Sequence, residues 1–80
     1  MQIKQAVVTR FKSLCEQRGI KYNELATLSG ITPSTVYIMM DENRKNLSII
    51  TVKKLCEGLE ISISEFFDCD IFQNLEQEIM

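Results

Sequence analysis

The side chains that could bind a metal ion or act as a nucleophile are few in this sequence, and they are poorly spaced for either task. The chain contains no histidine, and its cysteines, Cys15, Cys56 and Cys69, form no CxxC pair. We therefore expect no zinc or other metal site. No cysteine has an evident activating partner, and no glycine-rich phosphate-binding loop is present. The sequence predicts neither an enzyme nor a cofactor, and it shows no small-molecule ligand site.

The size and composition predict one small soluble domain. The chain has 80 residues, of which 45% are apolar and 25% are charged, as is usual for a globular protein. No apolar run approaches the roughly 20 residues that cross a bilayer. Lys4 and Arg10 interrupt the start, so we expect neither a signal peptide nor a membrane span. Cys15 and Cys56 are interpreted as buried free thiols, which suits a reducing cytoplasm.

The charged residues are divided unevenly along the chain. Residues 1–56 hold all nine basic residues and four acids, a balance of +5, whereas residues 57–80 hold seven acids and no base, a balance of −7. A basic body with an acidic tail can present a positive face despite the net charge of −2. Ordinary solvated surface charge would give the same composition, so the charges alone leave both interpretations open.

The stretch from Tyr22 to Asn43 has the pattern of two short helices joined by a tight turn. Gly30 can adopt the positive φ that the turn needs, Thr32 can cap the second helix, and Pro33 suits its first position. We expect the apolar residues of both helices to face inward, namely Leu25, Ala26, Ile31, Val36, Met39 and Met40, with Leu28 a further candidate. This pattern is typical of a helix-turn-helix, whose second helix commonly enters the DNA major groove. An ordinary helical hairpin is the alternative.

Three more helices are expected around this motif. One runs from about residue 2 to 18 and ends at Gly19, and another is capped by Ser48 and runs to about residue 59. The last begins with a capping box formed by Ser62 and Glu65. We expect Asn43 or Asn46 to take a left-handed conformation and Glu60 to be mildly strained. The predicted core faces comprise Ile3, Val7, Phe11, Leu14, Ile49, Val52, Leu55, Leu59 and Phe66.

The tail, residues 69–80, is separate from the predicted domain of residues 1–68. Ile71 or Phe72, Leu75 and Ile79 recur at helical spacing. The tail could form a short helix packed on its own domain, an apolar stripe that pairs with a second copy, or a frayed end. The sequence leaves these three alternatives open.

The order of these motifs resembles the Xre family of helix-turn-helix regulators, which has the lambda-repressor-like fold of phage repressors and Cro proteins. The resemblance covers about residues 8–67. It rests on Leu25-Ala26, Gly30-Ile31-Thr32, Ser34-Thr35-Val36, the apolar series 49–59 and the segment 61–67. It implies an all-α domain of five helices. It also implies a sequence-specific DNA-binding transcriptional regulator, expected to be a repressor that binds double-stranded DNA as a homodimer.

The resemblance also implies which residues contact DNA. Tyr22, with Asn23 beside it, lies at the start of the second helix, where the family often binds a phosphate. The major-groove face comprises Thr32, Pro33, Ser34, Thr35, Tyr37 and Ile38. The loop residues Asn43, Arg44 and Lys45 would contact the sugar-phosphate backbone.

Some positions depart from the family pattern. Met40 stands where the family often has Glu, and Glu42 where it often has Gly. The exposed side of the third helix has no Arg, Lys, Gln or Asn before Asn43, so modest base specificity is expected, with a share from DNA shape. Asp41 and Glu42 would repel phosphate. A protein-interaction or antitoxin-like module on the same fold, with weak or no DNA binding, is therefore the alternative function.

Overall fold

The computed structural model describes residues 1–77, and every regular element in that range is helical. Five α-helices are followed by a 3-10 turn, which confirms the predicted all-α architecture of five helices. The elements are α1 (Ile3–Arg18), α2 (Tyr22–Ser29), α3 (Pro33–Met40), α4 (Ile49–Gly58), α5 (Ile63–Phe67) and η1 (Asp70–Phe72).

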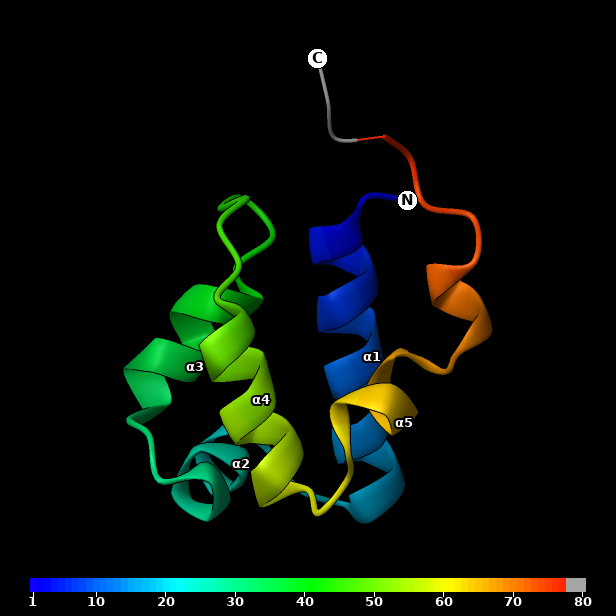
Figure 1. Cartoon of the computed structure of the whole chain (residues 1–80). Helices are drawn as coiled ribbons and strands as arrows, with labels where there is room; N and C mark the ends of the chain where they lie inside the picture. The colour runs from blue at the N-terminus through cyan, green and yellow to red at the C-terminus, as the bar shows by residue number, and fades with distance from the viewer. Residues whose placement is uncertain (78–80) are drawn as a thin grey trace.

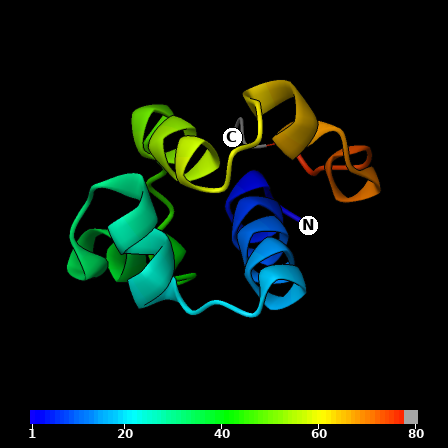
Figure 2. The same ribbon diagram turned by 90° about the horizontal axis from the view of Figure 1, so that it is seen from below.

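The long helix α1 stands between two groups of shorter elements (Figures 1 and 2). On one side α2 packs against both α3 and α4, and on the other η1 packs against α1. Helix α5 contacts α4 and so joins the two groups. None of the helices in residues 1–77 is both long and apolar enough to cross a membrane.

The predicted signals for helix ends are confirmed. Gly30 has φ 70°, the left-handed conformation that lets α2 end and the chain turn. The Thr32 hydroxyl accepts a hydrogen bond from the Thr35 N–H at 3.4 Å at the start of α3. The capping box of α5 is complete, because Ser62 Oγ accepts from the Glu65 N–H and Glu65 Oε1 accepts from the Ser62 N–H. Glu60 has φ 59°, which confirms the strain expected at that corner.

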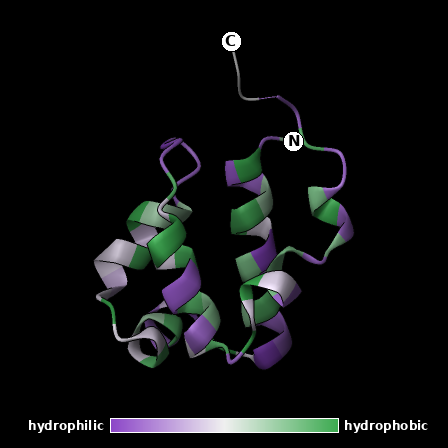
Figure 3. Ribbon diagram, in the orientation of Figure 1, coloured by the Kyte–Doolittle hydropathy of each residue, from purple (hydrophilic) through white to green (hydrophobic). Residues whose placement is uncertain are grey.

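The core lies where the five helices meet, and α3 contributes Val36, Met39 and Met40 to it. Phe11 and Phe66 are fully buried, and their ring centroids lie 4.4 Å apart. The helices carry both hydrophobic and hydrophilic segments, whereas the tip of the loop between α3 and α4 is hydrophilic throughout (Figure 3). Cys15 and Cys56 are buried free thiols, as predicted, and burial raises the pKa of Cys56 to about 11.

Helices α2 and α4 approach each other closely at Gly58. A Cβ atom added to Gly58 would clash with the Ser29 hydroxyl and would lie 3.0 Å from the backbone Cα of Ser29, which is tighter than most real Cβ contacts. The neighbouring Ser29 hydroxyl is buried without a hydrogen-bond partner among the described residues. The absence of a side chain at residue 58 therefore sets the separation of these two helices.

Three sequence predictions about single positions are wrong. Ile49 is 59% exposed, because it begins α4 and lies beyond the neighbours that cover Val52 and Leu55. Leu28 is also 59% exposed, because the inner side of α2 is made by Leu25 and Ala26. Neither Asn43 nor Asn46 has a positive φ.

The tail folds back on its own domain as far as the structure describes it. The Phe72 ring lies 5.9 Å from that of Phe66 and 4.9 Å from that of Phe67. The Glu76 carboxylate is 2.8 Å from the amino group of Met1. This arrangement matches the first alternative for residues up to 77, whereas Ile79 lies outside the described residues.

Candidate nucleic-acid interface

The outer side of α3 is open to solvent. Tyr37 is 51% exposed and Ile38 52%, whereas Val36 and Met39 on the opposite side are buried. Tyr22 contacts this face at Tyr37, and both Tyr37 and Ile38 stay about half exposed. The remaining groove residues predicted from the sequence are exposed as well, namely Thr32, Pro33, Ser34 and Thr35.

The first turn of α3 holds two hydroxyl groups in contact. Thr32 Oγ1 and Thr35 Oγ1 are 2.9 Å apart, and either oxygen could be the donor. Thr32 Oγ1 also accepts the Thr35 N–H, so its position is fixed by the helix start. The pair therefore presents hydroxyls of defined position at the exposed beginning of the helix.

The start of α2 lies beside the middle of α3. The rings of Tyr22 and Tyr37 meet edge to face, with centroids 5.6 Å apart and planes at 74°. Tyr22 is half-buried and packs against the core, and its burial raises the pKa of its phenol. The phenol therefore remains protonated near neutral pH and can donate a hydrogen bond. Asn23, next along α2, is exposed.

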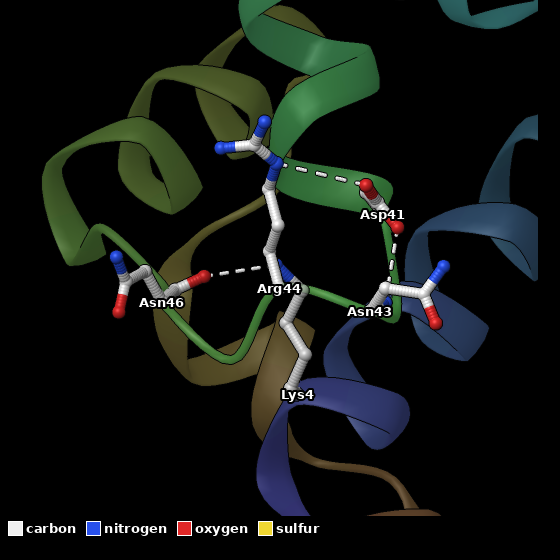
Figure 4. A network of polar contacts seen from close by, with 5 residues as sticks. All are labelled: Lys4, Asp41, Asn43, Arg44 and Asn46. Carbon is white, nitrogen blue, oxygen red and sulfur yellow. Dashed lines mark hydrogen bonds and ion pairs between the residues drawn. The ribbon is translucent and has the colours of Figure 1, made fainter.

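The loop after α3 is shaped by Asp41, as Figure 4 shows. Its carboxylate accepts the Asn43 N–H at 3.0 Å and lies 3.6 Å from the Arg44 guanidinium, while its carbonyl accepts the Arg44 N–H at 3.0 Å. This turn satisfies its backbone groups without a left-handed residue, which explains the incorrect prediction for Asn43. Arg44 and Lys45 are both exposed.

A hollow of about 310 Å³ separates α3 from the loop and the start of α4. It brings groove residues and a loop cation to one place, because Thr35 and Ile38 line it opposite Arg44. The predicted site residues thus come from α3 and from the loop after it. Tyr22 at the start of α2 contacts α3 through Tyr37. The other residues that line the hollow are Met39, Asn46, Leu47, Ser48 and Thr51.

Comparison with known proteins identifies the family of this chain. Residues 10–70 match the model of the Cro/C1-type HTH DNA-binding domain. The chain belongs to the Cro/C1-type helix-turn-helix family. Its fold is similar to the crystal structure of the prophage Lp1 protein 11, with a TM-score of 0.80 and 32% sequence identity, covering 94% of this chain and 100% of that one. No curated protein matches the chain significantly.

The electrostatics of this Cro/C1-type domain differ from what the charge balance suggested. Lys4 is buried, and the Arg10 guanidinium donates to the carbonyls of Phe66 and Glu65, so these two cations serve the fold. Lys53 pairs with Glu57 at 3.1 Å. The basic side chains around α3 are therefore Arg44 and Lys45 in the loop that follows it, and Lys12 and Lys21, which line a hollow with Tyr22 and Tyr37.

Sequence reasoning misses several residues around the site. The sequence predicts Ser48 only as a helix cap and gives Thr51 no role, yet both line the hollow beside Arg44. It also gives Lys4 no role in the site, yet the Lys4 ammonium reaches the loop. A signal for Lys4 is present, since it lies four residues before Val8 and seven before Phe11 on the buried side of α1.

Proposed function

We propose that this protein is a transcriptional regulator, acting as a repressor, that places α3 in the major groove of double-stranded DNA and binds as a homodimer. The observation that carries the proposal is the uncovered outer face of α3, flanked by Tyr22 and by the Arg44–Lys45 loop. A helix needs such an unobstructed face to enter a groove about 12 Å wide.

The side chains of the groove face distinguish bases with modest specificity. The hydroxyls of Ser34 and Thr35 form single hydrogen bonds, and Tyr37 reaches a base edge or a phosphate. Pro33 and Ile38 contact thymine methyl groups. Because no side chain on this face makes a bidentate base contact, part of the specificity comes from DNA shape.

The flanking residues bind the sugar-phosphate backbone. Arg44 and Lys45 supply the charge, and the polar groups of Tyr22, Asn23 and Asn43 supply further hydrogen bonds. One copy offers a small contact area, so pairing of two copies on half-sites about 34 Å apart supplies the affinity and the two-fold symmetry of the operator.

Selection from random duplexes, followed by anisotropy titrations at several salt concentrations, tests this function. We expect an enriched palindrome whose affinity falls steeply as salt rises, since bound counterions are released on binding. A lack of any enriched sequence, or affinity that does not respond to salt, would contradict the proposal.

A protein-interaction or antitoxin-like module is the second candidate. The base-poor outer face of α3 favours it, as do the acidic residues from Glu57 onward. In that case a stoichiometric protein partner would bind the chain, and the chain would show no affinity for duplexes. Titration of the purified chain with selected DNA distinguishes the two candidates directly.

A further inference from the structure

Among the described residues, Lys4 is the charged residue whose side chain is buried. It lies in the first turn of α1, and only 4% of its surface is exposed. Its Nζ donates a hydrogen bond to the carbonyl oxygen of Asn46 at 2.8 Å, across 42 residues of sequence. Figure 4 shows the side chain extending from α1 toward the loop that carries Arg44.

The hydrogen bond from Lys4 fixes the far half of the loop between α3 and α4. The near half is closed by the hydrogen bonds of Asn43 and Arg44 to Asp41. The Lys4 bond joins Asn46 to a different element, the scaffold helix α1. Arg44 and Lys45 therefore lie between two attachment points, in a segment without regular secondary structure.

A buried ammonium is a costly way to fill this position. Burial lowers the pKa of Lys4, as does the like charge of Arg44 to a lesser degree, while the charge of Asp41 acts in the opposite direction. An apolar side chain would suit the neighbouring Val7 and Val8 better, because a buried charge must be compensated by its partners. The contribution of Lys4 to stability therefore does not explain why a lysine stands at this position. Its hydrogen bond to the loop does explain it.

We propose that Lys4 is a positioning residue for DNA binding, which fixes the Asn46 carbonyl and so holds Arg44 and Lys45 in the conformation that meets the DNA backbone. This inference rests on the proposed function. Holding the loop before binding spares the complex the entropic cost of ordering it. Lys4 itself is buried beneath the loop and needs no contact with DNA.

The first test compares Lys4→Met with a matched control, Lys53→Met, on the selected duplex. Both variants remove one positive charge, but only the first also removes the hydrogen bond to the loop. We expect Lys4→Met to weaken binding about five- to tenfold and Lys53→Met less than about twofold. Lys4→Arg, which keeps a donor, is expected to restore most of the affinity. Equal affinities for Lys4→Met and wild type would overturn the proposal.

A double-mutant cycle shows whether Lys4 acts through the loop cations. In a background of Arg44→Ala and Lys45→Ala, the loop has no basic side chain left to position, so Lys4→Met should cause little further loss of affinity. A loss of the same size in both backgrounds would mean that Lys4 acts elsewhere, which contradicts the inference.

Hydrogen exchange of the backbone amides in residues 42–47 tests the attachment without DNA. Exchange should be faster in the full-length Lys4→Met variant than in wild type, with α2 and α4 unchanged. Unchanged exchange in the loop would overturn the proposal, whatever the binding data show. If Lys4→Met fails to fold, Lys4→Leu, which also lacks a donor, takes its place. Absence of DNA binding by wild type would instead overturn the proposed function, and exchange would then decide on the attachment alone.

Discussion

The two sides of α1 are built in contrasting ways. On one side, the segment from α5 to residue 77 is closed by the rings of Phe66, Phe67 and Phe72 and by Arg10, which donates to two carbonyls of α5. On the other side, α3 and its loop bury a narrow apolar face and leave their polar side chains in solvent. The first side uses its side chains to stabilise the fold, whereas the second leaves them free for a ligand.

This contrast suggests that different residues of one small domain serve folding and ligand binding. The inner face of α3 belongs to the core through Val36, Met39 and Met40, whereas its outer face carries exposed residues that contribute little to folding. Variants at buried positions on either side of α1 should therefore change the free energy of unfolding, and variants on the outer face of α3 and its loop should change DNA affinity. The following predictions test that separation, from the largest expected effect to the smallest.

Phe66→Ala should lower the free energy of unfolding by about 3–5 kcal/mol, because it removes a fully buried ring that contacts Phe11, Phe67 and Phe72. Urea denaturation followed by circular dichroism measures the change. Ser64→Ala, an exposed position on the same helix, is the control and should stay within about 0.5 kcal/mol of wild type. A small effect of Phe66→Ala would show that the closed side is not the stabilising one.

Ala26→Leu should cost about 1–3 kcal/mol of stability, because Ala26 is fully buried and the added atoms overpack the α2 side of the core. Thermal unfolding gives the change in stability. Thr27→Leu, at the exposed neighbouring residue, adds a similar side chain without overpacking and should be nearly neutral. Equal effects of the two variants would mean that this side tolerates extra volume.

Arg44→Ala and Lys45→Ala should leave stability within about 0.5 kcal/mol of wild type, because both side chains are exposed. Each should weaken binding to all duplexes and reduce the slope of log affinity against log salt by about 0.9 for each phosphate that the variant no longer neutralises. Titrations at four or more salt concentrations measure the slope. An unchanged slope in the double variant would place the DNA backbone elsewhere.

Asp41→Asn should give the smallest effect, a gain in DNA affinity of about two- to threefold at low salt. It removes the carboxylate that lies 3.6 Å from Arg44, while the amide oxygen can still accept the Asn43 N–H. Exposed ion pairs of this kind are weak and are screened by salt, so the gain should shrink at high salt. Weaker binding by this variant would indicate that Asp41 orients Arg44 rather than competing for it.

The ends of the helices could be predicted from the sequence because their causes are local. The cap at Thr32, the turn at Gly30 and the capping box of Ser62 and Glu65 each depend on residues within a few positions. The buried position of Phe66 was also predicted, since it follows from the apolar pattern around that box.

The errors concern features that depend on distant neighbours. Periodicity places Ile49 in line with Val52, but nothing in it shows where the covering helices end. The partner of Lys4 is a backbone carbonyl 42 residues away, which no local pattern reveals. The structure shows that the predicted groove and loop residues are exposed and adjacent, and their contacts with DNA stay a prediction until binding is measured.

The close approach at Gly58 has a consequence for the packing of α4. The last residue of α4 packs against Ser29 of α2. The cap of this helix, Ser48, and its first-turn residue Thr51 line the hollow beside α3. A methyl group added at residue 58 would meet the side chain and backbone of Ser29, so that the two helices would have to shift at this contact. We therefore expect Gly58→Ala to change how α4 packs on α2, at a position outside the hollow beside α3.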